Sequence, residues 1–226
     1  VLAFVPRHIA VRKKDLEHNT GTLETALPGL TIRQGLATRT LYFLFIACLL
    51  SALFSVALIL NLVPVLTSTG ISRAEAIGII STMGLVSIIG RLVGGALLDR
   101  FDARHIAIAA SFISLALPVA LLMFPGDARA AMIGVIAFGA TGGMKMNASV
   151  YLVSERFGAR SFGFFYSLIS ITFSVAQGIG PLAANYVYDV QGTYTPVIWS
   201  VIPAFAVSAV LFLALGRAPD GEPTGK

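Results

Sequence analysis

Long apolar stretches separated by short polar breaks dominate this sequence. Six such stretches follow one another along the chain, at 41–66, 76–98, 106–124, 130–153, 162–186 and 196–215. A helix needs about 20 mostly apolar residues to cross the hydrocarbon core of a bilayer, and each stretch has about that length. The pattern therefore predicts an all-α protein with six membrane-spanning helices.

The breaks between the stretches are short and rich in turn-forming residues. They lie at 69–73, 99–104, 125–127, 155–160 and 189–192. Connections this short place consecutive helices side by side and antiparallel. We therefore expect a six-helix domain over 40–216, after the end of an earlier helix and a cytoplasmic linker at 1–39, and before a cytoplasmic tail at 217–226. Within the linker, 31–38 is expected to form a short helix on the membrane surface, with Thr31 as its cap.

The composition supports a membrane protein, because 56% of the residues are hydrophobic and only 12% are charged. A soluble domain carries about 25% charged residues, so this chain has too little polar surface to cover an apolar core in water. Cys48 is the one cysteine and lies in an apolar run. A single cysteine excludes a disulfide within the chain and a cysteine-rich metal site, and we expect neither a metal nor a cofactor.

The Lys and Arg residues are divided unequally between the two ends of the predicted bundle. Twelve of the sixteen fall on one side, namely Arg7, Arg12, Lys13, Lys14, Arg33, Arg39, Arg100, Arg104, Arg156, Arg160, Arg217 and Lys226. Arg73 and Arg129 fall on the other side, and Arg91 and Lys145 lie inside spans. Basic loops mark the cytoplasmic side, so we expect both ends of the chain in the cytoplasm and the protein in the cell (inner or plasma) membrane. Charges spread over loops on one membrane face do not indicate nucleic-acid binding.

The spans differ in polarity, which indicates the helices that face a pathway. The third and sixth are apolar nearly all round and are expected to face lipid. The other four carry polar or small residues at helical spacing: Ser51, Ser55 and Asn61; Gly84, Ser87, Arg91, Gly94 and Gly95; Thr141, Gly142, Lys145, Ala148 and Ser149; Tyr166, Ser170, Ser174 and Gln177. Glycine pairs such as Gly90 and Gly94, or Gly139 and Gly143, fit either a pathway or close helix packing.

Arg91 and Lys145 carry the sharpest hypothesis. At about 1.5 Å per residue, Arg91 lies roughly 12 Å and Lys145 roughly 15 Å inside the cytoplasmic edge that Asp99 and Glu155 mark. A charge at that depth costs at least about 2.5–3.5 kcal/mol and faces a partner or a wet cavity, yet none of the eleven acidic residues lies inside a span. Three explanations remain: an acid elsewhere in a longer protein neutralises the two cations, one of them packs against a distant acid for structure alone, or the substrate is an anion. Lys145 could also exchange a proton.

A short basic pattern occurs twice, 56 residues apart, at 99–104 and 155–160. The copies read Asp-Arg-Phe-Asp-Ala-Arg and Glu-Arg-Phe-Gly-Ala-Arg. The offset spans two helices and two loops, so both copies lie on the same membrane face. We expect both to act as cytoplasmic clamps, although basic loops also converge under the positive-inside rule.

The first copy, with the preceding glycines, resembles a signature of the major facilitator superfamily. Its matching residues are Gly95, Leu97, Asp99, Arg100, Phe101 and Arg104, whereas Asp102 replaces the usual glycine. Further patterns resemble the monocarboxylate and oxalate/formate branch of that superfamily, at 61–64, 70–72, 156–163, 178–181 and 189–194. The resemblance covers about 31–215.

The resemblance implies the C-terminal six-helix half of a transporter with a 3+3 inverted repeat, and six more helices upstream. It implies a small mono- or dicarboxylate as substrate, contacted by an arginine of the second helix, here Arg91, and symport or antiport with a proton or an exchanged anion. The candidate substrate-binding residues are Arg91, Lys145, Gln177, Tyr166, Ser170 and Asn61. The candidate gating residues are Gly95, Asp99, Arg100, Arg104, Glu155 and Arg156, with Asp99 capping or pairing with a helix of the other half.

Other classes of protein fit less well. Intramembrane proteases need a buried histidine beside a Gly-x-Ser-Gly motif, buried aspartates or paired histidines, and His8, His18 and His105 lie in or beside loops. An enzyme is therefore not expected. Two alternatives remain: a carrier of a neutral or drug-like solute, with acids of the missing half beside the two cations, and a membrane scaffold or receptor that does not transport.

Overall fold

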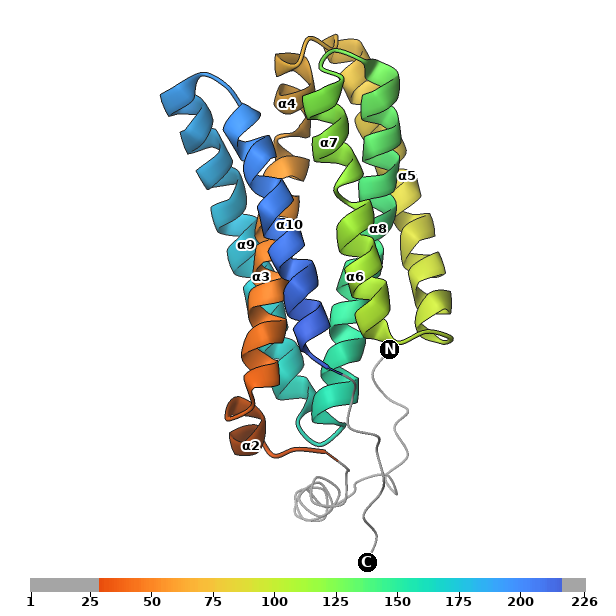
Figure 1. The fold of residues 1–226 in the computed structure, drawn as a ribbon, viewed down its shortest axis with the longest axis vertical. Coiled ribbons are helices and arrows are strands. Elements are labelled where there is room, and N and C mark those ends of the chain that lie inside the picture. The colour runs from red at the N-terminus through yellow and green to blue at the C-terminus, as the bar shows by residue number, and fades with distance from the viewer. Residues whose placement is uncertain (1–28, 217–226) are drawn as a thin grey trace, which may run out of the picture.

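The computed structural model describes residues 29–216, and this part of the chain is helical apart from one isolated bridge between Gly29 and Gly158 (Figure 1). Its helices are α2 (Ile32–Leu36), α3 (Arg39–Leu60), α4 (Leu62–Ser68), α5 (Arg73–Leu98), α6 (Ala103–Ile113), α7 (Ala116–Met123), α8 (Ala128–Phe157), α9 (Phe162–Gln191) and α10 (Thr195–Ala214). The predicted all-α fold is confirmed. The part of the predicted linker at 1–28 and the predicted tail at 217–226 lie outside the described residues.

Two of the six predicted spans are each divided into two helices. The first divides into α3 and α4 at Asn61, and the third divides into α6 and α7 at Ser114. Each break lies three or four residues before a proline, Pro64 or Pro118, whose ring would clash with the carbonyl four residues earlier in a continuous helix. Polar side chains bond the backbone at both breaks, because Asn61 Nδ2 donates to the carbonyl of Ala57 (3.0 Å) and Ser114 Oγ to that of Ala110 (2.7 Å).

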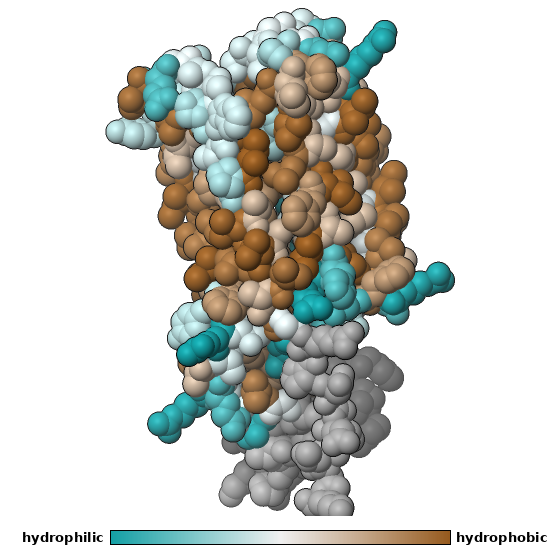
Figure 2. Space-filling model, viewed as in Figure 1, coloured by the Kyte–Doolittle hydropathy of each residue, from teal (hydrophilic) through white to brown (hydrophobic). Residues whose placement is uncertain are grey.

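By length and composition, five helical segments can cross a membrane: α3, α5, the α6–α7 pair, α9 and α10. Apolar side chains accordingly form a broad middle band between polar ends on the face that Figure 2 shows. The remaining predicted span, the fourth, is α8; it is 30 residues long but carries Lys145 and several glycines, which make it more polar than the others. It packs against α5, α6, α7 and α9, so its polar positions are covered by neighbouring helices.

Helix packing repeats after three spans. The first span packs on the fifth (α3 on α9) as the fourth packs on the second (α8 on α5), and the sixth packs on the first (α10 on α3) as the third packs on the fourth (α6 and α7 on α8). An offset of three antiparallel helices turns the second set upside down in the membrane. The packing therefore has the pattern of the predicted 3+3 inverted repeat.

Glycines allow α5 and α8 to approach closely. A Cβ added at any of four positions would meet the facing helix: Gly90 faces Ala140, Gly94 faces Met144, Gly139 faces Met83 and Gly143 faces Arg91. Both glycine pairs therefore serve close helix packing, and Gly139 and Gly143 also line a cavity between the helices. The third and sixth spans were expected to face lipid, and they do so on one side only. Each buries one face in the bundle and leaves large apolar side chains exposed on the other, for example Phe112 and Val210.

The short helix α2 forms as predicted, and Thr31 caps it in a reciprocal pair with Gln34. The residues before it are held against the turn between α8 and α9. Leu30 N donates to the carbonyl of Phe157 (3.0 Å), and Ser161 Oγ donates to the carbonyl of Leu30 (2.8 Å). The start of the bundle is thus tied to the turn that joins its fourth and fifth spans.

Candidate functional site

A cavity of about 290 Å³ lies between α3, α5 and α8, with one phenylalanine each from α9 and α10. Its charged and polar side chains are Cys48, Ser51, Ser55, Ser87, Arg91, Lys145 and Ser149. Its apolar side chains are Ala52, Val56, Ile59, Met83, Phe138, Met146, Phe173 and Phe212, and glycines 139, 142 and 143 complete the wall. The cavity therefore brings together both cations that the sequence places inside spans.

Lys145 is buried, with 7% of its surface exposed. Its ammonium lies 4.2 Å from the ring centroid of Phe205 and 5.7 Å from that of Phe138, and it donates a long hydrogen bond (3.5 Å) to Ser55 Oγ. Aromatic faces attract a cation, but they do not neutralise it. Among residues 29–216, no carboxylate forms an ion pair with Lys145, since the ion pairs there join Asp102 to Arg104 and His105.

Arg91 is exposed on the open side of the cavity. Its side chain crosses the helix interface at Gly143, where an added Cβ would touch Arg91 Cγ. Asn147 Nδ2 donates to the Arg91 carbonyl (3.1 Å), which fixes the backbone beneath the side chain. The guanidinium has no hydrogen bond or ion pair with the part of the chain that the structure describes, so its five N–H donors remain available.

The hydroxyl groups of the cavity fall into two sets. Ser87 and Ser149 use their protons within their own helices, on the carbonyls of Gly84 and Lys145 (both 2.8 Å). Ser51 and Ser55, one turn apart on α3, donate to no described residue and keep their protons free. No Asp, Glu, Asn, Gln or His of residues 29–216 lines the cavity. Free donors and positive charge without competing acceptors suit an anion.

The other predicted binding residues lie elsewhere. Tyr166 lines a second recess of about 550 Å³ between α5, α8 and α9, together with Gly95 and Asp99. Ser170 Oγ donates to the carbonyl of Tyr166 (3.0 Å), and Gln177 is exposed on α9. Asn61 is buried at the break between α3 and α4, where it bonds to its own helix. The 290 Å³ cavity thus includes Arg91 and Lys145 and none of these four.

The phenylalanines of the cavity were not among the predicted site residues. Phe138 precedes Lys145 by seven residues, which is two helical turns, so the sequence does place both on one face. Phe212 comes from the sixth span, which was expected to face lipid, and Phe173 is the single residue that α9 contributes. Met146 lines both the cavity and the second recess, so the two hollows adjoin along α8.

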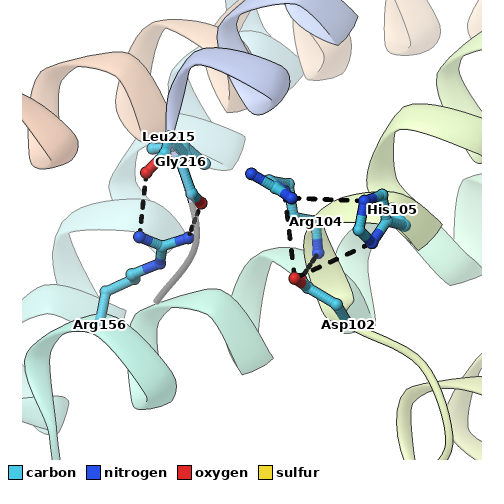
Figure 3. Close-up of polar contacts among 6 residues, drawn as sticks. All are labelled: Asp102, Arg104, His105, Arg156, Leu215 and Gly216. Atoms are coloured by element: carbon cyan, nitrogen blue, oxygen red, sulfur yellow. Dashed lines mark hydrogen bonds and ion pairs between the residues drawn. The ribbon is translucent and has the colours of Figure 1, made fainter. Parts of the chain in front are cut away.

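The two copies of the basic pattern lie close enough for their charges to interact, and Figure 3 shows Asp102 and Arg104 of the first copy with Arg156 of the second. In the first copy Asp102 caps α6 by accepting from Arg104 N (2.8 Å), and its carboxylate pairs with Arg104 and His105 at 4.0 and 3.9 Å. The usual glycine of the signature is thus replaced by a helix cap. In the second copy Arg156 donates to the carbonyls of Leu215 and Gly216 and so caps the end of α10.

Glu155, which follows the predicted fourth span, lies close enough to charged residues of both copies for them to affect its pKa. Burial and the nearby carboxylate of Asp102 raise its pKa, against the smaller opposing effect of Arg156 and Arg104. Asp99 forms the end of α5 and Arg100 is exposed beside it. All six predicted gating residues therefore lie at one end of the molecule, at the foot of α5, α6 and α8.

The family model described as Major Facilitator Superfamily matches residues 44–226. A search of curated proteins found no match. Structures with a similar fold include the transporter FucP in its outward conformation, with a TM-score of 0.67 and 18% identity over 84% of this chain and 48% of that one.

Two further similar structures are membrane transporters. A variant of the E. coli fucose:proton symporter FucP has a TM-score of 0.68 and 17% identity over 83% of this chain and 46% of that one. A variant of the peptide transporter POT, in complex with sulfate, has a TM-score of 0.71 and 16% identity over 90% of this chain and 43% of that one. The chain thus spans less than half the length of these structures.

Proposed function

This chain belongs to the major facilitator superfamily, and on that premise we propose that it is the C-terminal lobe of a secondary active transporter that carries a small organic anion by alternating access. Five apolar helical segments and the family make it a multi-pass membrane protein. The remaining parts of the proposal concern the substrate, the partner lobe and the gate.

The observation that carries the proposal is the cavity with two cations and no acid of the described residues. Arg91 has a free guanidinium fork, which suits a planar carboxylate through two parallel hydrogen bonds. Lys145 adds a point charge that is held by aromatic rings and one serine. An anionic substrate would supply the neutralising charge that residues 29–216 do not.

The length of the similar structures supports a second lobe. Each is more than twice as long as the part that this chain matches, so an N-terminal six-helix half would close the open side of the cavity, where Arg91 lies. In this arrangement Asp99, Glu155 and the arginines beside them act at the cytoplasmic gate. The distribution of Lys and Arg favours cytoplasmic ends and the cell membrane. A proton or an exchanged anion would complete the transport cycle.

A carrier of a neutral solute is the second candidate, because FucP is described as a fucose symporter and has this fold. A sugar presents many hydroxyl protons, which need acceptor side chains. This lobe's share of the cavity offers no carboxylate or amide of the described residues, so the anion is the better supported substrate.

Arg91→Ala in the full-length protein tests the proposal by uptake into proteoliposomes of radiolabelled lactate, oxalate and benzoate. We expect uptake of any transported carboxylate to fall at least tenfold, with expression and thermal unfolding unchanged, because the exposed guanidinium supports no other described residue. Arg73→Ala, at the far end of α5, is the matched control and should transport normally. Unchanged uptake by the Arg91→Ala variant would refute the proposal.

A further inference from the structure

We infer that the substrate is a carboxylate with an apolar body about the size of one ring, such as an aromatic or branched aliphatic acid, and that Phe138, Phe173 and Phe212 select it. This inference rests on the proposed function and narrows it. It distinguishes such acids from compact polar anions such as oxalate or lactate.

The wall of the cavity is mainly apolar. Three phenyl rings converge on it from three helices, Phe138 from α8, Phe173 from α9 and Phe212 from α10. Aliphatic side chains of Val56 and Ile59 extend the same surface along α3. A substrate body that carries hydroxyl or carboxyl groups would lose its hydration against this wall without gaining hydrogen bonds, whereas an apolar body is favoured there.

The free donors are few and they gather around the cations. Ser87 and Ser149 donate their hydroxyl protons to helix carbonyls. The groups left to bind a substrate are Arg91, Lys145, Ser51 and Ser55. These groups are available for one carboxylate, and they leave no further free donors of the described residues for a hydroxyl group on the rest of the molecule. The polar groups are therefore left for the carboxylate, and the apolar side chains of the wall are left for the rest of the substrate.

The rings are held in place by their neighbours. Phe138 is 1% exposed, and its ring stacks on that of Phe205 at 6.1 Å between centroids. Phe212 is also 1% exposed. Rings in offset or edge contact favour another aromatic group beside them. This lobe's share of the cavity is about 290 Å³, which is room enough for one ring with its carboxylate.

Isothermal titration of the full-length protein with matched acids tests the inference. Benzoate and cyclohexanecarboxylate have a ring-sized apolar body, acetate has almost none, and oxalate replaces it with a second charge. We expect the first two to bind at least tenfold more tightly than acetate and oxalate. Tighter binding of oxalate than of benzoate would overturn the inference and leave the anion proposal standing, whereas a failure of all four to bind would contradict the proposed function itself.

Phe173→Leu tests the role of the rings, because this side chain is half-buried and its helix contributes nothing else to the cavity. The variant should weaken benzoate binding at least threefold and leave acetate binding unchanged. Phe112→Leu, an exposed phenylalanine of α6 outside the cavity, should alter neither. An equal loss for both acids in Phe173→Leu, or no loss for benzoate, would overturn the inference; the acid series on the unmodified protein decides the question if the variant does not fold.

Discussion

At the scale of single residues, the molecule is organised around Lys145. Lys145 is a buried residue whose ammonium group lies near two phenyl rings and a serine, and a buried charge is a costly feature for a membrane helix. Such a cost persists where function requires it, and the neighbouring Arg91 shares the same cavity. The free donors of Ser51 and Ser55 lie on the helix opposite. These four side chains are the groups that we propose bind the anion.

Lys145→Met separates a functional charge from a structural one. Methionine has similar length and no charge, so the ligand-free full-length protein should be at least as stable as the unmodified protein. Its free energy of unfolding should rise by about 2.5–3.5 kcal/mol if the whole cost of the charge is removed. The stabilisation by a bound carboxylate, measured as a shift of the unfolding midpoint, should shrink. A lower midpoint with an unchanged ligand shift would mean that Lys145 pairs with an acid of the other lobe.

The sequence could predict these two cations because depth in a membrane follows from position along a helix. It could not predict the cavity wall as well. Gln177 and Ser170 form a polar face on α9, yet α9 presents Phe173 to the cavity, because the rotation of a helix depends on its packing partners. Phe212 was not predicted for a related reason. The sixth span is apolar, and its sequence does not show which of its faces is buried in the bundle.

At the scale of helices, the contact between α5 and α8 determines where the cations lie. Four glycines let the two backbones approach, and the side chain of Arg91 crosses at one of them, Gly143. The sequence predicted both helices and the spacing of the glycines. It did not predict the breaks at Asn61 and Ser114, because the effect of a proline on a membrane helix depends on whether neighbouring groups bond the freed carbonyls.

Gly90→Ala tests the helix contact. The added methyl group would meet the backbone of Ala140, so the two helices must separate, at a cost of about 1–3 kcal/mol that thermal unfolding of the full-length protein would detect. Gly84→Ala on the same helix meets nothing within 4 Å in this lobe and should be neutral, or stabilising by up to about 1 kcal/mol. Equal effects of the two substitutions would contradict the close packing of α5 on α8.

At the scale of the whole molecule, two related basic patterns lie at one end, because two antiparallel spans separate them along the chain. One copy caps the start of α6 through Asp102, and the other caps the end of α10 through Arg156. Polar groups of the two patterns thus cap one end of the third span and one end of the sixth, and these two spans are equivalent in the inverted repeat. The sequence shows that the basic pattern occurs twice, whereas the helix ends that the two copies cap are seen only in the structure.

Arg156→Gln should reduce stability, because Arg156 donates charged hydrogen bonds to the carbonyls of Leu215 and Gly216. Bonds of this kind contribute about 1.5–3 kcal/mol each at most, and partial exposure lowers that figure. Arg160→Gln, on the exposed end of the same pattern, should leave the unfolding midpoint unchanged. An equal decrease in both variants would show that net charge, and not the cap on α10, is responsible.

The most direct measurement compares benzoate with benzamide, which has the same shape and no charge, by titration of the full-length protein. If Arg91 and Lys145 form an anion site, benzoate should bind at least tenfold more tightly, a difference of about 1.4 kcal/mol. Arg91→Gln should remove most of that difference, while Arg73→Gln should preserve it. Equal affinity for the two compounds, or no binding of benzoate, would contradict the account of this lobe as half of an organic-anion carrier.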